Sequence, residues 1–142
     1  MKTQLHKFPF WFAAVLLALF IPACSEPGKN VDVQAQINLL KTGDENAKQD
    51  ALVKLGEAKE NAAPAIPAIL DAMKDTDPIV RRLACYAIEQ IGPGKAKSAI
   101  PAVKAMMNDP DQNVSMQAMN TLATLDPKNA PAGKGGPPPT PQ

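Results

Sequence analysis

The stretch Ala65-Ile66-Pro67-Ala68-Ile69 returns 34 residues later as Ala99-Ile100-Pro101-Ala102-Val103. The acidic pair Asp75 and Asp77 returns at the same spacing as Asp109 and Asp111. A fainter copy lies 33 residues upstream, where Val33, Leu40 and Asp44 correspond to Ile66, Met73 and Asp77. Self-similarity at this period is typical of stacked helix pairs, because one pair cannot bury its apolar face alone. We therefore predict an all-α fold, a short α-solenoid of about three antiparallel helix pairs.

Helix starts and ends are marked at matching places in the first, middle and last units. Pro67 and Pro101 suit the first turn of a helix, since a missing N–H costs nothing there. The second helices should begin after N-caps, because a carboxylate accepts free backbone N–H groups. These predicted caps are Asp44, Asp77 and Asp111. Gly92-Pro93-Gly94 should end the middle unit and Asp126-Pro127 the last.

Each second helix has an apolar face with helical spacing, which we predict to be the core face. In the middle unit this face holds Val80, Leu83, Ala84, Ala87, Ile88 and Ile91. In the last unit it holds Val114, Ala118, Thr121, Leu122 and Leu125, and in the first Ala47, Ala51, Leu55 and Ala58.

The first 23 residues differ in character from the rest of the chain. Lys2, His6 and Lys7 form a basic start, and an apolar run from Phe8 to Ile21 follows. A run of this length is typical of a signal peptide and is short for a membrane span. We therefore predict a signal peptide over residues 1–23, then a linker over 24–30 and the repeats over 31–131. Residues 132–142 are rich in Gly and Pro, which favours a disordered or polyproline tail.

Without the leader, the chain has 13 basic and 14 acidic residues, no His, and Tyr86 as its only aromatic residue. A chain without His lacks the commonest general base and a usual zinc ligand. Its charges form no basic block, so the electrostatic footprint of a nucleic-acid-binding protein is absent. We therefore expect a protein that is not an enzyme and that uses no cofactor, metal ion or nucleic acid.

The leader closes with Ile21-Pro22-Ala23-Cys24-Ser25. This segment resembles a bacterial lipoprotein signal, in which a short lipobox precedes the Cys that becomes the acylated N-terminus. Ile21, Ala23 and Cys24 match that pattern, whereas Pro22 stands where a small residue is usual. The resemblance implies lipidation of Cys24 and a membrane anchor in the bacterial cell envelope.

The residue after the Cys bears on the destination of the lipoprotein. In bacteria with two membranes, a Ser directly after the lipidated Cys is usually found in lipoproteins that are exported to the outer membrane, facing the periplasm. Ser25 occupies this position. Ordinary cleaved secretion, an uncleaved anchor and a disulfide between Cys24 and Cys85 are the alternatives that the sequence leaves open.

The segment from Ala65 to Pro93, with its Ile-Pro start, its Asp-Pro turn and its Gly-Pro end, resembles a HEAT repeat of the short bacterial form known as phycobilisome-lyase HEAT-like. Tetratricopeptide repeats would need aromatic positions that this chain does not fill, and an ankyrin repeat would need a Thr-Pro-Leu-His-like turn. The resemblance places the family's turn Asp at Asp77 and its second-helix Arg at Arg81. Ser115 and Lys48 occupy the Arg position in the other units, so an Asp–Arg ladder would be incomplete and stacking would rest on apolar contacts.

In HEAT arrays the second helices line the concave side, so the resemblance implies a protein-binding face there. On a helical wheel, one stripe opposite the core face holds Arg82, Tyr86, Glu89, Met116 and Asn120, with Gln49, Val53 and Ala123 beside them. Tyr, Arg and Met are enriched at interfaces, so Arg82 and Tyr86 are the strongest candidates. The alternative is a plain surface pair, with Tyr86 lying over Arg82 one turn away.

These features predict an envelope adaptor that is anchored to the membrane through Cys24 and binds a protein partner whose identity the sequence leaves open. A structural spacer that uses its Pro-rich tail is the second hypothesis. The third is a lyase-type enzyme, by analogy with chromophore lyases of HEAT-like fold.

Overall fold

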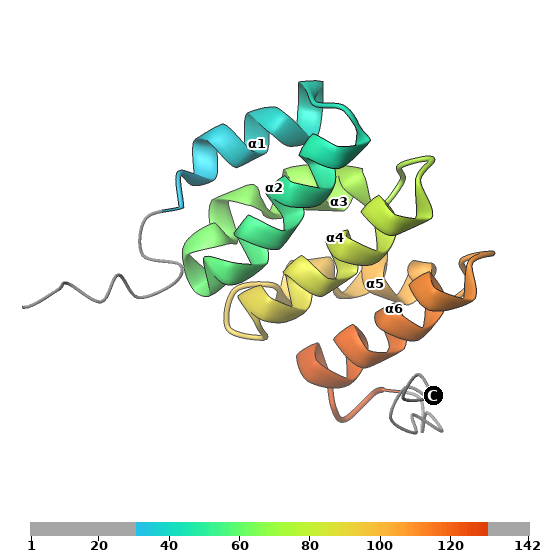
Figure 1. The fold of residues 1–142 in the computed structure, drawn as a ribbon. Helices are drawn as coiled ribbons and strands as arrows, with labels where there is room; N and C mark the ends of the chain where they lie inside the picture. The colour runs from blue at the N-terminus through green and yellow to red at the C-terminus, as the bar shows by residue number, and fades with distance from the viewer. Residues whose placement is uncertain (1–30, 131–142) are drawn as a thin grey trace, which may run out of the picture.

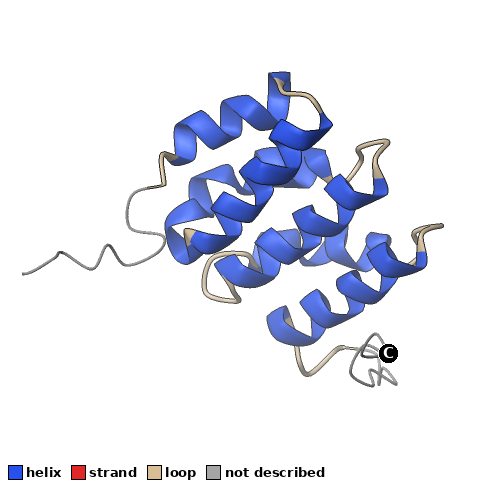
Figure 2. Ribbon diagram, in the orientation of Figure 1, coloured by secondary structure: helices blue, strands red, loops and turns tan. Residues whose placement is uncertain are grey.

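The computed structural model describes residues 31–130, and this part of the chain is built of helices and loops without a strand (Figure 2). The predicted signal peptide, the linker at 24–30 with Cys24, and the tail at 132–142 lie outside the described residues. Within 31–130 the six α-helices form three antiparallel pairs. They are α1 (Val33–Thr42) with α2 (Glu45–Glu57), α3 (Ile66–Ala72) with α4 (Pro78–Ile91), and α5 (Ile100–Met106) with α6 (Gln112–Leu125).

The pairs stack in two layers, as an α-solenoid does (Figure 1). The second helices α2, α4 and α6 lie side by side in one layer, and the first helices α1, α3 and α5 lie behind them. The second helices pack closely along one another, whereas the first helices have few contacts among themselves. The second helices therefore form one continuous layer that links the three units.

The second helices begin at aspartate caps. The Asp44 carboxylate accepts the Ala47 N–H at 2.8 Å, and that of Asp77 accepts the Ile79 N–H at 3.0 Å. Asp111 accepts two backbone N–H groups, from Asn113 and Val114. Each carboxylate therefore satisfies backbone donors that the helix itself leaves free.

The second helices end in different ways. Gly92 follows α4 with φ at 80°, a left-handed conformation that costs glycine little and other residues more. Asp126 follows α6, and its N–H still donates to the Leu122 carbonyl at 2.8 Å.

Two short 3₁₀ helices were not anticipated from the sequence: η1 (Lys59–Ala65) before α3 and η2 (Lys97–Ala99) before α5. Ala62, Ala65 and Ala99 are fully buried in these connectors. Because alanine is small, the connecting backbone can run close to the helices that it joins.

The core is aliphatic and centres on α4, which packs against both α2 and α6. The predicted core positions Val80, Ala84, Ala87, Ile88 and Ile91 are all buried. Leu83 differs from the prediction, since it is only partly buried and lies at the junction of α4 and α6. Leu83 still packs against the core, and it also lines a hollow on the outer face.

Candidate functional site

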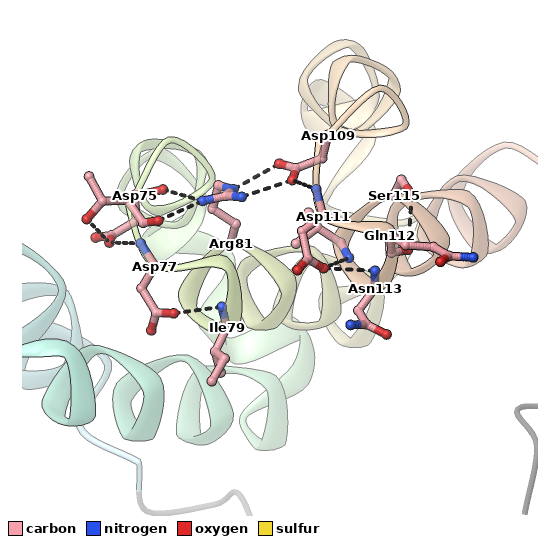
Figure 3. A network of polar contacts seen from close by, with 11 residues as sticks. Asp75, Asp77, Ile79, Arg81, Asp109, Asp111, Gln112, Asn113 and Ser115 are labelled. Atoms are coloured by element: carbon pink, nitrogen blue, oxygen red, sulfur yellow. Dashed lines mark hydrogen bonds and ion pairs between the residues drawn. The ribbon is translucent and has the colours of Figure 1, made fainter.

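Arg81 joins the middle unit to the last through the turns between their helices (Figure 3). Its Nε and Nη2 atoms donate to the two carboxylate oxygens of Asp109 at 2.8 and 2.9 Å. Its Nη1 atom donates to the carbonyls of Asp75 and Thr76 at 2.9 and 3.0 Å. The side chains of Arg81 and Asp109 are 14% and 6% exposed, respectively. The planar guanidinium group therefore connects the two turns at a place that is largely shielded from solvent.

The first unit is bridged at the matching place by a lysine. Lys48 donates to the Asp75 carboxylate at 2.7 Å, and Gln49 beside it donates to Asp77 at 2.8 Å. The Asp–Arg ladder is therefore incomplete, as the sequence predicts, but stacking does not rest on apolar contacts alone, because polar bridges connect both junctions between units. Only Ser115 breaks the series, and its hydroxyl donates within its own helix to the Gln112 carbonyl.

The carboxylates of this ladder have shifted acidities. The hydrogen bond from Arg81 lowers the pKa of Asp109, and the hydrogen bond from Lys48 lowers the pKa of Asp75. In both cases burial opposes the shift, and the backbone N–H of Asp111 or Asp77 adds to it. Both groups are therefore held as carboxylates at neutral pH, which suits a structural bridge.

The predicted stripe lies on the open face of the second helices. Arg82, Tyr86, Met116 and Asn120 are exposed there, and Glu89 is partly buried. Of the flanking positions, Val53 and Ala123 are exposed, and Gln49 is turned toward Asp77. The structure thus brings the stripe residues of three helices onto one face.

Glu89 is held between α4 and α6. Its carboxylate accepts the Gln117 amide N–H at 2.7 Å and the hydroxyls of Thr121 and Thr124, each at 3.4 Å. The buried Thr121 hydroxyl also lies 3.1 Å from the Cys85 carbonyl of α4. Glu89 therefore fastens the two second helices together beneath the exposed stripe.

Tyr86 lies against α2. A Cβ atom placed on Gly56 would come within 3.2 Å of Cε1 of the tyrosine ring, so the ring rests on the one residue of that helix turn without a side chain. Tyr86 as a whole remains 37% exposed. The aromatic ring thus packs against the glycine on one side and is open to solvent on the other.

A shallow, open hollow of about 250 Å³ lies beside this ring. Its lining combines a cation, an aliphatic group, an aromatic ring and an amide: Arg82, Leu83, Tyr86 and Gln117. Ligand pockets for small molecules are usually larger and more enclosed, at roughly 300–1,000 Å³. The hollow is better suited to one side chain of a protein than to a small molecule.

The described residues offer little for catalysis. Cys85 is a free thiol, and burial raises its pKa to about 12, so it is protonated and unreactive at neutral pH. In the range 31–130, His, Cys, Asp and Glu form no group that could hold a metal ion.

The sequence reasoning missed four contributors to these sites. Asp75 and Asp109 were noted only as members of the repeated acidic pairs, yet they accept hydrogen bonds from the bridging Lys48 and Arg81. Leu83 was assigned to the core, and Gln117 was not considered. These last two residues are 34 positions apart, so aligning the units would have shown that one helix position faces the junction of second helices in each.

The comparisons with known proteins agree with the geometry. The family model described as HEAT repeats matches residues 33–123. No curated protein and no solved structure gives a match.

Proposed function

Because this chain belongs to the HEAT-repeat family, we propose that it is a membrane-anchored scaffold that holds a protein partner against its second helices. HEAT repeats are in general protein-interaction scaffolds and are typically not catalytic. The partner would contact Arg82, Tyr86, Met116 and Asn120, with Glu89 supporting the face from below.

The observation that carries this proposal is the placement of apolar side chains. The described residues include four large hydrophobic side chains that are exposed, and three of them lie along the stripe: Val53, Tyr86 and Met116. They come from three different helices, α2, α4 and α6. Single exposed apolar residues are normal, but a row across three helices is typical of an interaction surface.

The centre of this face has the composition of an interface core. Tyr and Arg are the residues most often found at the energetic centre of protein interfaces, and here they flank the hollow. Arg82 can donate to a carboxylate or carbonyl of the partner, while Tyr86 and Leu83 offer apolar contact. The packing on Gly56 fixes the ring, so little conformational entropy would be lost on binding.

The site can be tested by photocrosslinking. Met116→p-benzoylphenylalanine places a reactive group on the stripe, and Lys104→p-benzoylphenylalanine places the same group on the exposed surface of α5 in the other layer. We expect one abundant protein adduct from position 116 and none from position 104. Adding Tyr86→Ala and Arg82→Ala should remove the adduct without loss of helicity. The proposal that this face is the binding site would be wrong if position 104 gave an adduct of equal yield. It would also be wrong if the adduct from position 116 persisted in the double substitution.

The anchor forms a separate part of the proposal and rests on the sequence around Cys24. Among the helices at 31–130, none combines the length and the apolar character needed to cross a membrane. We propose that acyl chains on Cys24 hold the protein in the bacterial envelope, with the outer membrane as destination. Cys24→Ser should abolish labelling by radioactive palmitate and move the protein from the membrane fraction to the soluble fraction. Unchanged labelling of Cys24→Ser would exclude this site of lipidation.

A further inference from the structure

The last unit ends the stack with an apolar face that the middle unit keeps covered. Residues 34 apart occupy equivalent places, so the middle unit serves as an internal reference. Ala72, Met73 and Cys85 are 8%, 2% and 0% exposed. Their equivalents Met106, Met107 and Met119 are only partly buried.

This end of the stack is not built like a polar cap. Terminal repeats normally carry a polar outer face, because no further repeat covers them. At the last unit three partly buried positions carry methionine, and two of these residues, Met106 and Met107, also pack against the core. The flexible methionine side chain adapts to irregular apolar surfaces.

Another HEAT unit is a poor candidate to cover this face. Each junction within the described chain is bridged by a cation from the preceding unit, Lys48 or Arg81, to an aspartate in the next. Ser115 occupies that place in the last unit and makes its hydrogen bond within α6. In the first unit, Thr42 occupies the position that Asp75 and Asp109 have in the other units. A second copy stacked head to tail would therefore lack both the cation and the carboxylate of the bridge.

The chain itself continues from this face. After α6 it repeats the start of the connector that leads to the next unit, since Asn129-Ala130 matches Asn61-Ala62 at twice the 34-residue period. Ala62 and its equivalent Ala96 are fully buried under the connectors, and Ala130 is already partly buried. Up to Asn129 the backbone repeats the turn that follows α4, since Asn129 N–H donates to the Asp126 carbonyl as Lys95 N–H donates to that of Gly92.

We propose that the segment at 131–142 docks on the face formed by Met106, Met107 and Met119 and closes the solenoid in place of a fourth unit. Its Pro137-Pro138-Pro139 run favours the polyproline II conformation, so little entropy is lost when it binds. Twelve residues in that conformation span about 37 Å, whereas α6 with its 14 residues is about 21 Å long. Because the segment is part of the same chain, its high effective concentration makes weak apolar contacts sufficient.

Methionine oxidation tests this docking without a known partner, and it does not depend on the proposed function of the second helices. Purified full-length protein is treated with dilute hydrogen peroxide beside a variant carrying Pro137→Ser, Pro138→Ser and Pro139→Ser. We expect the variant to oxidise at least threefold faster at Met106, Met107 and Met119, with unchanged circular dichroism. Met116 is the control within each sample, because it is 47% exposed on the other face and should react equally in both.

A second readout identifies the occupant. Pro138→p-benzoylphenylalanine should crosslink within one chain to a methionine of this face, and Lys41→p-benzoylphenylalanine at the opposite end should not. Equal oxidation rates in the two proteins would overturn the proposal. Crosslinks between chains, with protection that rises with protein concentration, would also overturn it and assign the face to a second copy.

Discussion

At the scale of single residues, Arg81 connects two of the turns between helices. Its four hydrogen bonds join the Asp109 carboxylate to two carbonyls of the preceding turn. Removing it leaves Asp109 shielded from water without its cation. We expect Arg81→Ala to lower the free energy of unfolding by about 2 kcal/mol, as measured by urea denaturation.

The neighbouring arginine provides a matched control for that measurement. Arg82 is exposed and lines the hollow rather than a turn. Arg82→Ala should change stability by less than about 0.5 kcal/mol while it weakens partner binding. Equal stability losses in the two variants would mean that charge, and not the bridging geometry, explains the effect.

The same ladder predicts how stability depends on pH. The pKa values of Asp109 and Asp75 are lower in the folded protein than the ordinary value near 3.9. Their contribution is therefore complete above about pH 4 and is lost as the pH falls through the lower folded pKa. Urea denaturation between pH 7 and pH 2 should show this decrease, and Asp109→Asn should flatten it. A decrease of the same size in Asp109→Asn and in the unchanged chain would assign it to other carboxyl groups.

Gln36 is a residue that the fold tolerates at a cost. It is 8% exposed in α1, and its side-chain carbonyl oxygen has no hydrogen-bond partner within the described residues. Methionine has a similar volume and no such oxygen, so Gln36→Met should raise the free energy of unfolding by about 1 kcal/mol. Thermal denaturation is the measurement. A loss of stability would show that the amide is solvated in solution.

At the scale of the helices, the outer helix α1 should be less protected than the central helix α4. Only Gln36 and Leu40 of α1 are buried, whereas α4 buries six residues between two neighbouring helices. Local opening costs least where few apolar contacts are broken. In hydrogen exchange the amides of α1, and those of α5 with only Val103 buried, should therefore exchange before those of α4. Slowest exchange in α1 would contradict the assignment of α4 as the centre of the core.

The helices also show what could be predicted from the sequence. The second helices and their caps follow from local rules, since Asp77 meets an N–H only two residues along the chain. The bridge from Arg81 to Asp109 spans 28 residues and depends on how the units stack, which no local pattern encodes. The role of Gly56 could not be predicted for the same reason, because it depends on contact with the Tyr86 ring of the next unit.

At the scale of the whole molecule, Cys85 can report whether the units unfold together. Its side chain is fully buried between α4 and its neighbours, and burial raises the pKa of the thiol to about 12. A thiol reagent can therefore react only after the stack opens. In a Cys24→Ser chain, which leaves Cys85 as the single thiol, labelling should be very slow in buffer and should accelerate with urea in parallel with the loss of helicity.

The reason lies in the way that stability is shared along a solenoid. Each unit contacts only its neighbours, so opening at Cys85 requires separating α4 from α6 and breaking the Arg81 bridge at the same junction. Arg81→Ala should therefore accelerate labelling in buffer by about the factor that corresponds to its loss of stability, roughly 30-fold for 2 kcal/mol. Rapid labelling of the unchanged chain at full helicity would instead show that the last unit detaches on its own while the first two remain folded.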